Sequence, residues 1–293
     1  MYEAFYGLRE PPFHVTADPA FLFLSQQHRE ALDHLEYGIQ QRLGFLEITG
    51  EVGSGKTTVI KAMVLRLPAA VRTAVILNPN LSDVQLLEAI VRDFGLEPAH
   101  ATRGALMASL NDFLLEQWRQ GRTTVLIIDE AQTLSARALE QIRLLSNLET
   151  DKAKLLQIVL VGQPELSAKL AVPLLRPLRQ RIAVRYHIQP LDLPEIGDYI
   201  AHRLRAAGAR GHRPAFTPEA IQAVARYSRG LPRAINHLCD KALLAGFVRE
   251  TSTIDAPLIQ QAIAALEGSV DAQEDTDELD YRRLTEGSAT PRA

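Results

Sequence analysis

The stretch that most constrains this chain is GEVGSGKTTV, which runs from residue 50 to residue 59. It matches the phosphate-binding pattern G-x-x-x-x-G-K-[ST], and it stands between an apolar run that predicts a strand and KTTVIKAMVLRL, which predicts a helix. Glycines let the backbone wrap closely around a phosphate chain, and successive N–H groups at a helix N-terminus offer partial positive charge. We expect Lys56 to reach the outer phosphates and the Thr57 hydroxyl to bind Mg²⁺. The predicted binding residues of this loop are Gly50, Glu51, Val52, Gly53, Ser54, Gly55, Lys56, Thr57 and Thr58.

A pair of carboxylates follows a second apolar run. The segment TVLIIDEAQ predicts a strand that ends at Asp129 and Glu130. A carboxylate at the end of a strand near the loop can hold the Mg²⁺ shell, which is the role we predict for Asp129. The adjacent Glu130 points elsewhere and can polarise a water for attack on the terminal phosphate. The alternative interpretation is an ordinary solvated strand end. The phosphate-binding pattern upstream favours the first interpretation.

Short apolar runs alternate with longer helical patterns over residues 1–190. The runs are rich in Val, Ile and Leu and do not alternate with polar residues, as in parallel sheets that helices cover on both faces. The fold class predicted is therefore α/β, with a parallel five-stranded sheet and flanking helices. The expected strands are Gly44–Thr49, Thr73–Leu77, Thr123–Ile128, Leu155–Val161 and Ala183–His187.

After residue 190 the strand patterns cease and helical segments follow. Proline recurs at their first positions, where its missing N–H and fixed φ suit a helix start. We expect a small all-helical domain over residues 191–267 and a disordered acidic tail over 268–293. The expected helices are Pro194–Ala207, Pro218–Ser228, Pro232–Val248 and Ala256–Leu266.

Charge and composition narrow the class of protein. The net charge is −3, so the chain as a whole shows no strong electrostatic preference for nucleic acid. The single cysteine, Cys239, excludes an internal disulfide and fits a reducing compartment. We find no signal-peptide pattern and no run near the roughly 18 apolar residues of a membrane span. A cytoplasmic protein without a membrane span of its own is the expectation, with peripheral attachment to the inner membrane through a partner as a variant.

Together, these residues resemble an AAA+ ATPase, and more closely the ExeA (general secretion pathway protein A) type, a group similar to pilus-biogenesis and TniB/TnsC-like transposition ATPases. The resemblance covers residues 1–266 and rests on FYGLREPPFHVTADPAFLFLSQQHREALDHLEYGI followed by RLGFLEITGEVGSGKTT. It implies ATP and Mg²⁺ as ligands, a helical lid after the α/β domain, a family-specific N-terminal segment over residues 1–43, and a homo-oligomeric ring or filament.

The resemblance also implies roles for further residues. Gln163, after LLQIVLVG, matches the sensor 1 position near the terminal phosphate, and Asn78, after TAVIL, matches a polar residue that restrains the catalytic glutamate. In LRPLRQRI, Arg181 fits best as an arginine finger and Arg179 is second; the alternative for Arg181 is a surface arginine in a salt bridge. In GLPR, Arg233 matches sensor 2 on the lid.

Two other sets of residues receive an interpretation. The segment around Pro12–Phe13 and Pro19 matches the family's adenine pocket. His28 and His34 are interpreted as helix-surface or packing residues rather than metal ligands.

The resemblance leaves the biological role open between two classes. The first is a motor or switch for assembly of a secretion, pilus or polysaccharide-export system in the cell envelope. ExeA-like relatives often add a membrane span and a peptidoglycan-binding region; the expectation here is either that a separate subunit supplies the anchor or that the protein works elsewhere. The second is a DNA-associated regulator that forms ATP-dependent oligomers on duplex DNA, for which the basic run HRLRAAGARGHRP is the supporting feature. A signalling switch that rarely turns over is a third option.

Overall fold

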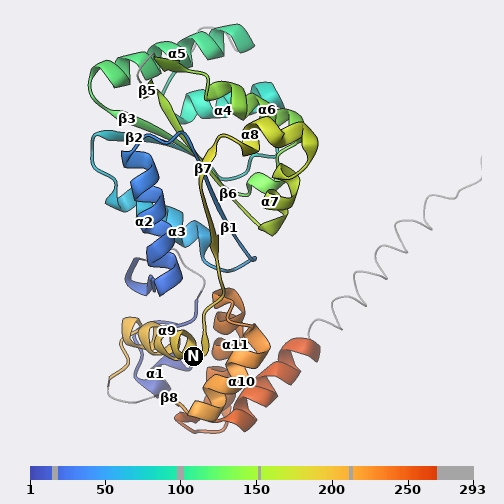
Figure 1. Cartoon of the computed structure of the whole chain (residues 1–293). Helices are drawn as coiled ribbons and strands as arrows, with labels where there is room; N and C mark the ends of the chain where they lie inside the picture. The colour runs from blue at the N-terminus through green and yellow to red at the C-terminus, as the bar shows by residue number, and fades with distance from the viewer. Residues whose placement is uncertain (15–18, 98–101, 151–152, 211–213, 269–293) are drawn as a thin grey trace, which may run out of the picture. The chain divides into compact units, whose positions relative to one another are not determined.

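One unit of the chain, Leu24–Pro190, is built on a five-stranded parallel sheet (Figure 1). The structure is a computed structural model that describes residues 1–14, 19–97, 102–150, 153–210 and 214–268. Each neighbouring pair of strands in the sheet runs parallel, which confirms the predicted fold class. In spatial order the strands are β2 (Val71–Ile76), β3 (Thr123–Ile128), β6 (Leu156–Gly162), β1 (Phe45–Gly50) and β7 (Ile182–Ile188).

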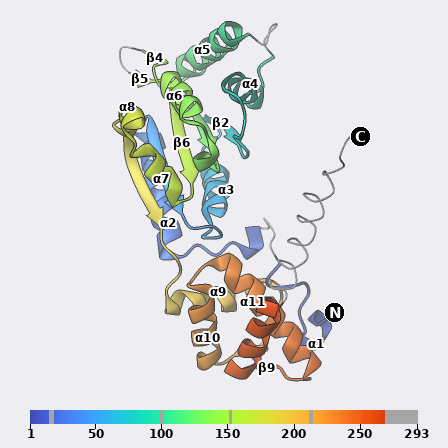
Figure 2. The same ribbon diagram turned by 90° about the vertical axis from the view of Figure 1, so that its right-hand side faces the viewer.

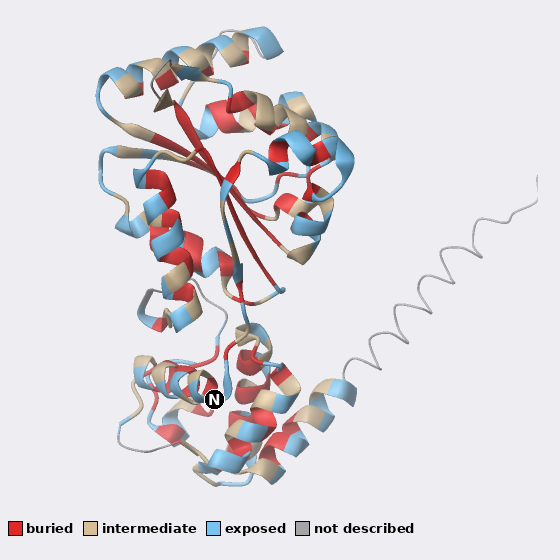
Figure 3. Ribbon diagram, in the orientation of Figure 1, coloured by how far each residue is buried: buried red, intermediate tan, exposed pale blue. Residues whose placement is uncertain are grey.

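The central strands are buried on both faces. Every residue of β1 and β6 is buried, as are five of the six in β3 (Figure 3). Continuous runs of Val, Ile and Leu are therefore required there, because neither face meets water. The register pairs Phe45 with Ile158 and Thr49 with Gly162, so the carboxyl ends of β1 and β6 lie at the same edge of the sheet.

Helices cover the two faces of this sheet. On one face, α2 packs closely on β1, since a Cβ on Gly38 would lie 2.1 Å from a methyl carbon of Leu46. On the other face, α7 contacts the same strand, and the Ser167 hydroxyl donates to buried Glu47. The helices of the first face are α2 (Gln26–Gln40) and α3 (Lys56–Arg66); those of the second are α4 (Asp83–Asp93), α5 (Arg103–Arg119), α6 (Ala136–Leu145), α7 (Pro164–Leu170) and α8 (Arg176–Arg179). β4 (Glu149–Thr150) pairs antiparallel with β5 (Ala153–Lys154).

The other unit consists of Met1–Phe23 together with the chain from Leu191 onward. Its helices pack on one another, and α10 contacts both α9 and α11 (Figure 2). Its elements are α1 (Glu3–Tyr6), a 3₁₀ turn (Pro19–Phe21), α9 (Leu193–Ala206), α10 (Pro218–Ser228), α11 (Pro232–Val248) and a helix over residues 256–268. The two units divide after Phe23 and after Pro190.

Two features of this unit differ from the sequence-based expectation. Residues 1–23 join the helical unit instead of the α/β part, because Tyr2, Tyr6, Phe13 and Phe21 fill its core. A short parallel pairing, β8 (Ala215–Phe216) with β9 (Thr253–Ile254), also occurs after residue 190. Two-residue strands are too short to leave a periodic pattern in the sequence.

Two further expectations concern the acidic tail and membrane-spanning helices. The acidic tail lies outside the described residues beyond position 268. Within the described ranges, no helix combines the length and the apolar character that a membrane crossing requires.

Candidate nucleotide-binding site

The predicted phosphate loop connects the end of β1 to the start of α3. Gly55 has φ +95° and Gly53 has φ +77°, both in the left-handed region that favours glycine. A Cβ on Gly50 would lie 2.7 Å from the Ser54 hydroxyl oxygen and 3.1 Å from the Ile188 carbonyl oxygen. A side chain at Gly50 would thus be crowded, and the backbone conformation favours glycine at Gly53 and Gly55. A loop of this kind can bring backbone amides close to a phosphate chain.

Lys56 lies at the first position of α3 with its side chain buried. Its Nζ donates to the carbonyl oxygens of Gly50 and Glu51, each at 2.9 Å. Burial lowers the pKa of Lys56, whereas the nearby carboxylates of Glu130, Asp129, Glu51 and Glu165 act to raise it. One lysine charge among four carboxylates is too small to offset the charge of a triphosphate.

Thr57 and Asp129 form a pair of hard oxygen donors beside the loop. The Thr57 hydroxyl donates to Asp129 Oδ2 at 2.8 Å, and Asp129 Oδ1 accepts the Glu130 backbone N–H at 2.9 Å. Asp129 is 3% exposed, and each of its carboxylate oxygens accepts a hydrogen bond from one of these neutral donors. Hydroxyl and carboxylate oxygens are the ligand types that Mg²⁺ prefers, so the two residues fit the predicted metal role.

Glu130 is held by two glutamine amides. Its Oε2 accepts hydrogen bonds from Gln132 Nε2 at 2.5 Å and from Gln163 Nε2 at 3.3 Å. Gln132 also accepts the Gln163 backbone N–H at 3.1 Å, so the three residues form a closed network. Glu130 has φ +52°, a strained value for a residue with a side chain, and such strain is often found at functional sites.

Gln132 is a site residue that the sequence reasoning missed. A Cβ on Gly162 would lie 2.8 Å from Gln132 Oε1, so the glycine at the end of β6 leaves room for this amide. The signal was present in the sequence, since Gln132 closes the segment TVLIIDEAQ two positions after the carboxylate pair. Sequence alone does not show that a 3₁₀ turn over Ala131–Thr133 turns this side chain back to Glu130.

Gln163, matched to sensor 1, and Asn78, matched to the residue that restrains the catalytic glutamate, lie at different places in the α/β unit. Gln163 follows β6, the strand between β1 and β3, and touches Glu130. Asn78 follows the edge strand β2 and is exposed, and its Oδ1 accepts the Asn80 backbone N–H at 3.5 Å. The carboxylate of Glu130 is thus restrained by Gln132 and Gln163, and Asn78 is engaged with its own turn.

The two candidates for the arginine finger lie at the end of the sheet opposite to the phosphate loop. Arg181 precedes β7, whose register pairs Ile182 with Phe45 and Ile188 with Gly50. At a rise of about 3.3 Å per residue, the start of β7 is roughly 17 Å from the phosphate-loop end of β1. Arg181 Nη1 donates to the Ser146 hydroxyl and to Asn147 Oδ1, both at 2.6 Å. Arg179 is exposed on α8, so it is the freer of the two predicted guanidinium groups.

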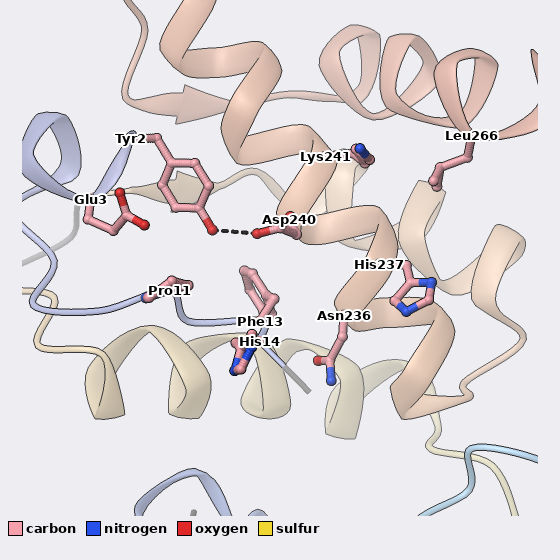
Figure 4. Close-up of a pocket in the computed structure, with 10 residues that line it drawn as sticks. All are labelled: Tyr2, Glu3, Pro11, Phe13, His14, Asn236, His237, Asp240, Lys241 and Leu266. Atoms are coloured by element: carbon pink, nitrogen blue, oxygen red, sulfur yellow. Dashed lines mark hydrogen bonds between the residues drawn. The ribbon is translucent and has the colours of Figure 1, made fainter. Parts of the chain in front are cut away.

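The helical unit carries the remaining predicted residue and a hollow of its own. Arg233 is the second residue of α11 and is exposed. A hollow of about 520 Å³ lies between the N-terminal segment and α11, where the Tyr2 hydroxyl donates to Asp240 (Figure 4). Phe13, from the segment matched to an adenine pocket, lines it, and the phosphate-loop residues belong to the other unit.

Comparisons with known proteins agree with this geometry. The family model described as "AAA domain" matches residues 39–170. General secretion pathway protein A of Aeromonas hydrophila is 48% identical over 256 residues, which cover 87% of this chain and 46% of that protein. The chain thus spans about half the length of this relative.

Solved structures share the fold at low sequence identity. The Aeropyrum pernix ORC2 protein in ADPNP–ADP complexes superposes with a TM-score of 0.63 and 19% identity, over 87% of this chain and 71% of that one. Drosophila ORC bound to DNA gives a TM-score of 0.69 and 21% identity, over 93% of this chain and 67% of that one. At these identities the likeness concerns the fold alone.

The glutamine network generates a prediction for Gln132→Leu. Leucine keeps the size of the side chain and removes the amide that restrains Glu130, so turnover of bound ATP should fall about 10-fold or more while nucleotide affinity stays unchanged. Steady-state hydrolysis and equilibrium nucleotide binding measure the two quantities. The matched control is Gln120→Leu, which removes a glutamine–glutamate hydrogen bond, to Glu116, on the exposed end of α5. Equal losses of turnover in both variants would contradict the positioning role.

Proposed function

Because the chain belongs to the AAA+ ATPases and its sequence is of the general secretion pathway protein A type, we propose that it binds and hydrolyses ATP with magnesium and acts as a homo-oligomer in the assembly of an envelope secretion, pilus or polysaccharide-export system. The observation that carries the ATPase part is the cluster of Lys56, Thr57, Asp129 and Glu130 around the phosphate loop. It supplies an anion cradle, a cation, two metal ligands and a base in one place.

Each of these residues has a distinct task in the proposed reaction. The loop amides and Lys56 bind and orient the phosphates of ATP, because they offer N–H donors and positive charge. Thr57 and Asp129 hold Mg²⁺, which when bound offsets the negative charge of the phosphates. Hydrolysis of this kind depends mainly on positioning and charge stabilisation.

Glu130 is the base in this proposal. Its Oε2 is engaged by the amides of Gln132 and Gln163, so Oε1 is the oxygen offered to the attacking water. Glu130 accepts a proton from that water, and Gln163 lies beside it directly after β6, the strand next to β1. The two amides fix the direction of the carboxylate, which keeps the water on line with the terminal phosphate.

Two substitutions separate binding from turnover. Lys56→Ala should remove the buried cation and abolish tight ATP binding, whereas Glu130→Gln should bind ATP with unchanged affinity and lose turnover by about 10²-fold or more. Equilibrium titration with a fluorescent ATP analogue and steady-state phosphate release measure the two effects. Retained tight binding by Lys56→Ala would show that the loop does not hold the nucleotide, and unchanged hydrolysis by Glu130→Gln would remove it as the base.

An arginine supplied in trans is the second part of the proposal. The finger candidates stand at the sheet edge opposite their own phosphate loop, so they can serve only a neighbouring protomer. Arg179 is our choice, because the guanidinium of Arg181 is bound by side chains of its own chain. In other phosphate-loop enzymes such an arginine raises the rate by about 10³–10⁵.

Subunit mixing tests this arrangement. Arg179→Ala should lose about 10³-fold in turnover, and activity should return when it is mixed with Glu130→Gln, since an intact base then faces an intact arginine. The measurement is phosphate release from the two proteins alone and together. Arg176→Ala, a change at another exposed arginine of α8, is the control and should keep full activity. A mixture no more active than its components would contradict a finger at Arg179.

The envelope role is supported by the relative from Aeromonas hydrophila, and the DNA-associated role by a different observation. The helical unit exposes several arginines that no acidic residue pairs within the described part of that unit, and these could contact phosphates of DNA: Arg205, Arg210, Arg226, Arg229 and Arg233. Arg203 does not belong to this set, because it is buried and donates to the carbonyl oxygens of Pro12 and His14.

DNA binding distinguishes the two roles. For the envelope role, the protein with a non-hydrolysable ATP analogue should show no saturable affinity for duplex DNA at about 0.15 M salt. A DNA-associated regulator would bind, and the logarithm of its binding constant would fall linearly with that of the salt concentration. Fluorescence anisotropy of labelled duplex over a salt series measures this, and such a slope would replace the envelope role by the alternative.

A further inference from the structure

His28 of α2 touches the phosphate loop. Its side chain is 3% exposed, and Nε2 lies 2.8 Å from the carbonyl oxygen of Ser54. From the sequence His28 is expected to be a helix-surface or packing residue, and the structure shows a specific polar contact in addition. Both ends of that contact belong to the α/β unit, where α2 lies before β1 and the loop lies after it.

The partners of the ring fix its tautomer. The Ser25 backbone N–H donates to Nδ1 at 3.3 Å, so Nδ1 is the acceptor nitrogen. Nε2 faces a carbonyl oxygen, which can only accept, so Nε2 carries the hydrogen and donates it. His28 also completes a capping box at the start of α2, since its own backbone N–H donates to the Ser25 hydroxyl.

The hydrogen bond from His28 to the Ser54 carbonyl also orients the next amide, that of Gly55. In a trans peptide, the C=O of one residue and the N–H of the next point in opposite directions. Because His28 fixes the Ser54 carbonyl toward α2, it directs the Gly55 N–H to the other side of the loop. A hydrogen bond to the carbonyl also polarises the peptide and makes that N–H a stronger donor.

The same contact constrains Gly55. A Cβ at this position would lie 2.7 Å from His28 Nε2, so any side chain here would push the ring away. Its φ of +95° independently favours glycine. The glycine before Lys56 is thus required by the approach of His28 as well as by the backbone conformation.

We propose that His28 is a positioning residue for the phosphate loop: it donates to the Ser54 carbonyl and thereby holds the Gly55 N–H ready for a phosphate oxygen of the nucleotide. This inference rests on the proposed nucleotide binding and adds α2, an element that precedes the loop motif in sequence, to the binding machinery. It predicts that His28 contributes to nucleotide affinity through a donated hydrogen bond, and that the helix cap at Ser25 contributes to stability alone.

Two substitutions at one position separate the roles. His28→Gln keeps an acceptor for the Ser25 N–H and a donor for the Ser54 carbonyl, whereas His28→Glu keeps only the acceptor at pH 8. We expect the Gln variant to bind a fluorescent ATP analogue within about 3-fold of the unaltered protein, and the Glu variant to bind it about 10-fold more weakly or worse. Ser25→Ala, which removes the hydroxyl cap alone, should lower the melting temperature and leave affinity within the range of the Gln variant.

The outcomes are distinguishable from failure of the proposed function. If the unaltered protein takes up no nucleotide, the proposed function fails. If it binds and the Gln and Glu variants bind equally well, the role of His28 is overturned while nucleotide binding stands. Should both variants unfold, ¹⁵N NMR of ring-labelled histidine in the unaltered protein decides the matter: a neutral Nε2–H ring whose Nε2 signal shifts on nucleotide addition supports the proposal, and an Nδ1–H ring or an unresponsive signal overturns it.

Discussion

The site depends on parallel strand pairing, which brings the carboxyl ends of β1, β3 and β6 to one edge of the sheet. The hydrogen bond from Thr57 to Asp129 joins residues 72 positions apart in sequence across this edge. This hydrogen bond can form because β6 lies between β1 and β3 and pairs with both of them in register. The phosphate loop, the carboxylate pair and Gln163 each follow one of these three strands. The pairing of the strands therefore also fixes the positions of the site residues relative to one another.

The charges around the loop are the physical reason for proposing a metal-bound phosphate chain as the ligand instead of a free one. Lys56 is buried and is surrounded by four carboxylates that oppose the effect of burial on its pKa. Asp129 is buried beside it with neutral donors. A second cation reduces the repulsion that the carboxylates exert on an incoming anion, which gives a physical reason for pairing a threonine hydroxyl and an aspartate with this loop.

Three polar side chains near these groups contact other residues of the site. Gln132 and Gln163 restrain Glu130, and His28 contacts the backbone of the phosphate loop. Each of them donates to an oxygen that cannot donate in return, so the direction of every one of these hydrogen bonds is fixed. Side chains that are held in this way position reactive groups more accurately than loops alone can, because a small displacement of the reacting atoms lowers the rate strongly.

The sequence by itself determined the five strands, their parallel arrangement, the helices of the second unit and the placement of the glycine-rich loop after β1 and of the two carboxylates after β3. These follow from local patterns: apolar runs, capping residues, and a spacing of glycine, lysine and threonine that only a phosphate cradle requires. Only the tertiary structure decided that residues 1–23 pack among the C-terminal helices, that Gln132 instead of Asn78 contacts Glu130, that Arg181 is occupied by Ser146 and Asn147, and that His28 reaches the loop. The reason is that these contacts join segments far apart in sequence or depend on the direction of one side chain, and neither leaves a periodic signal in a single chain.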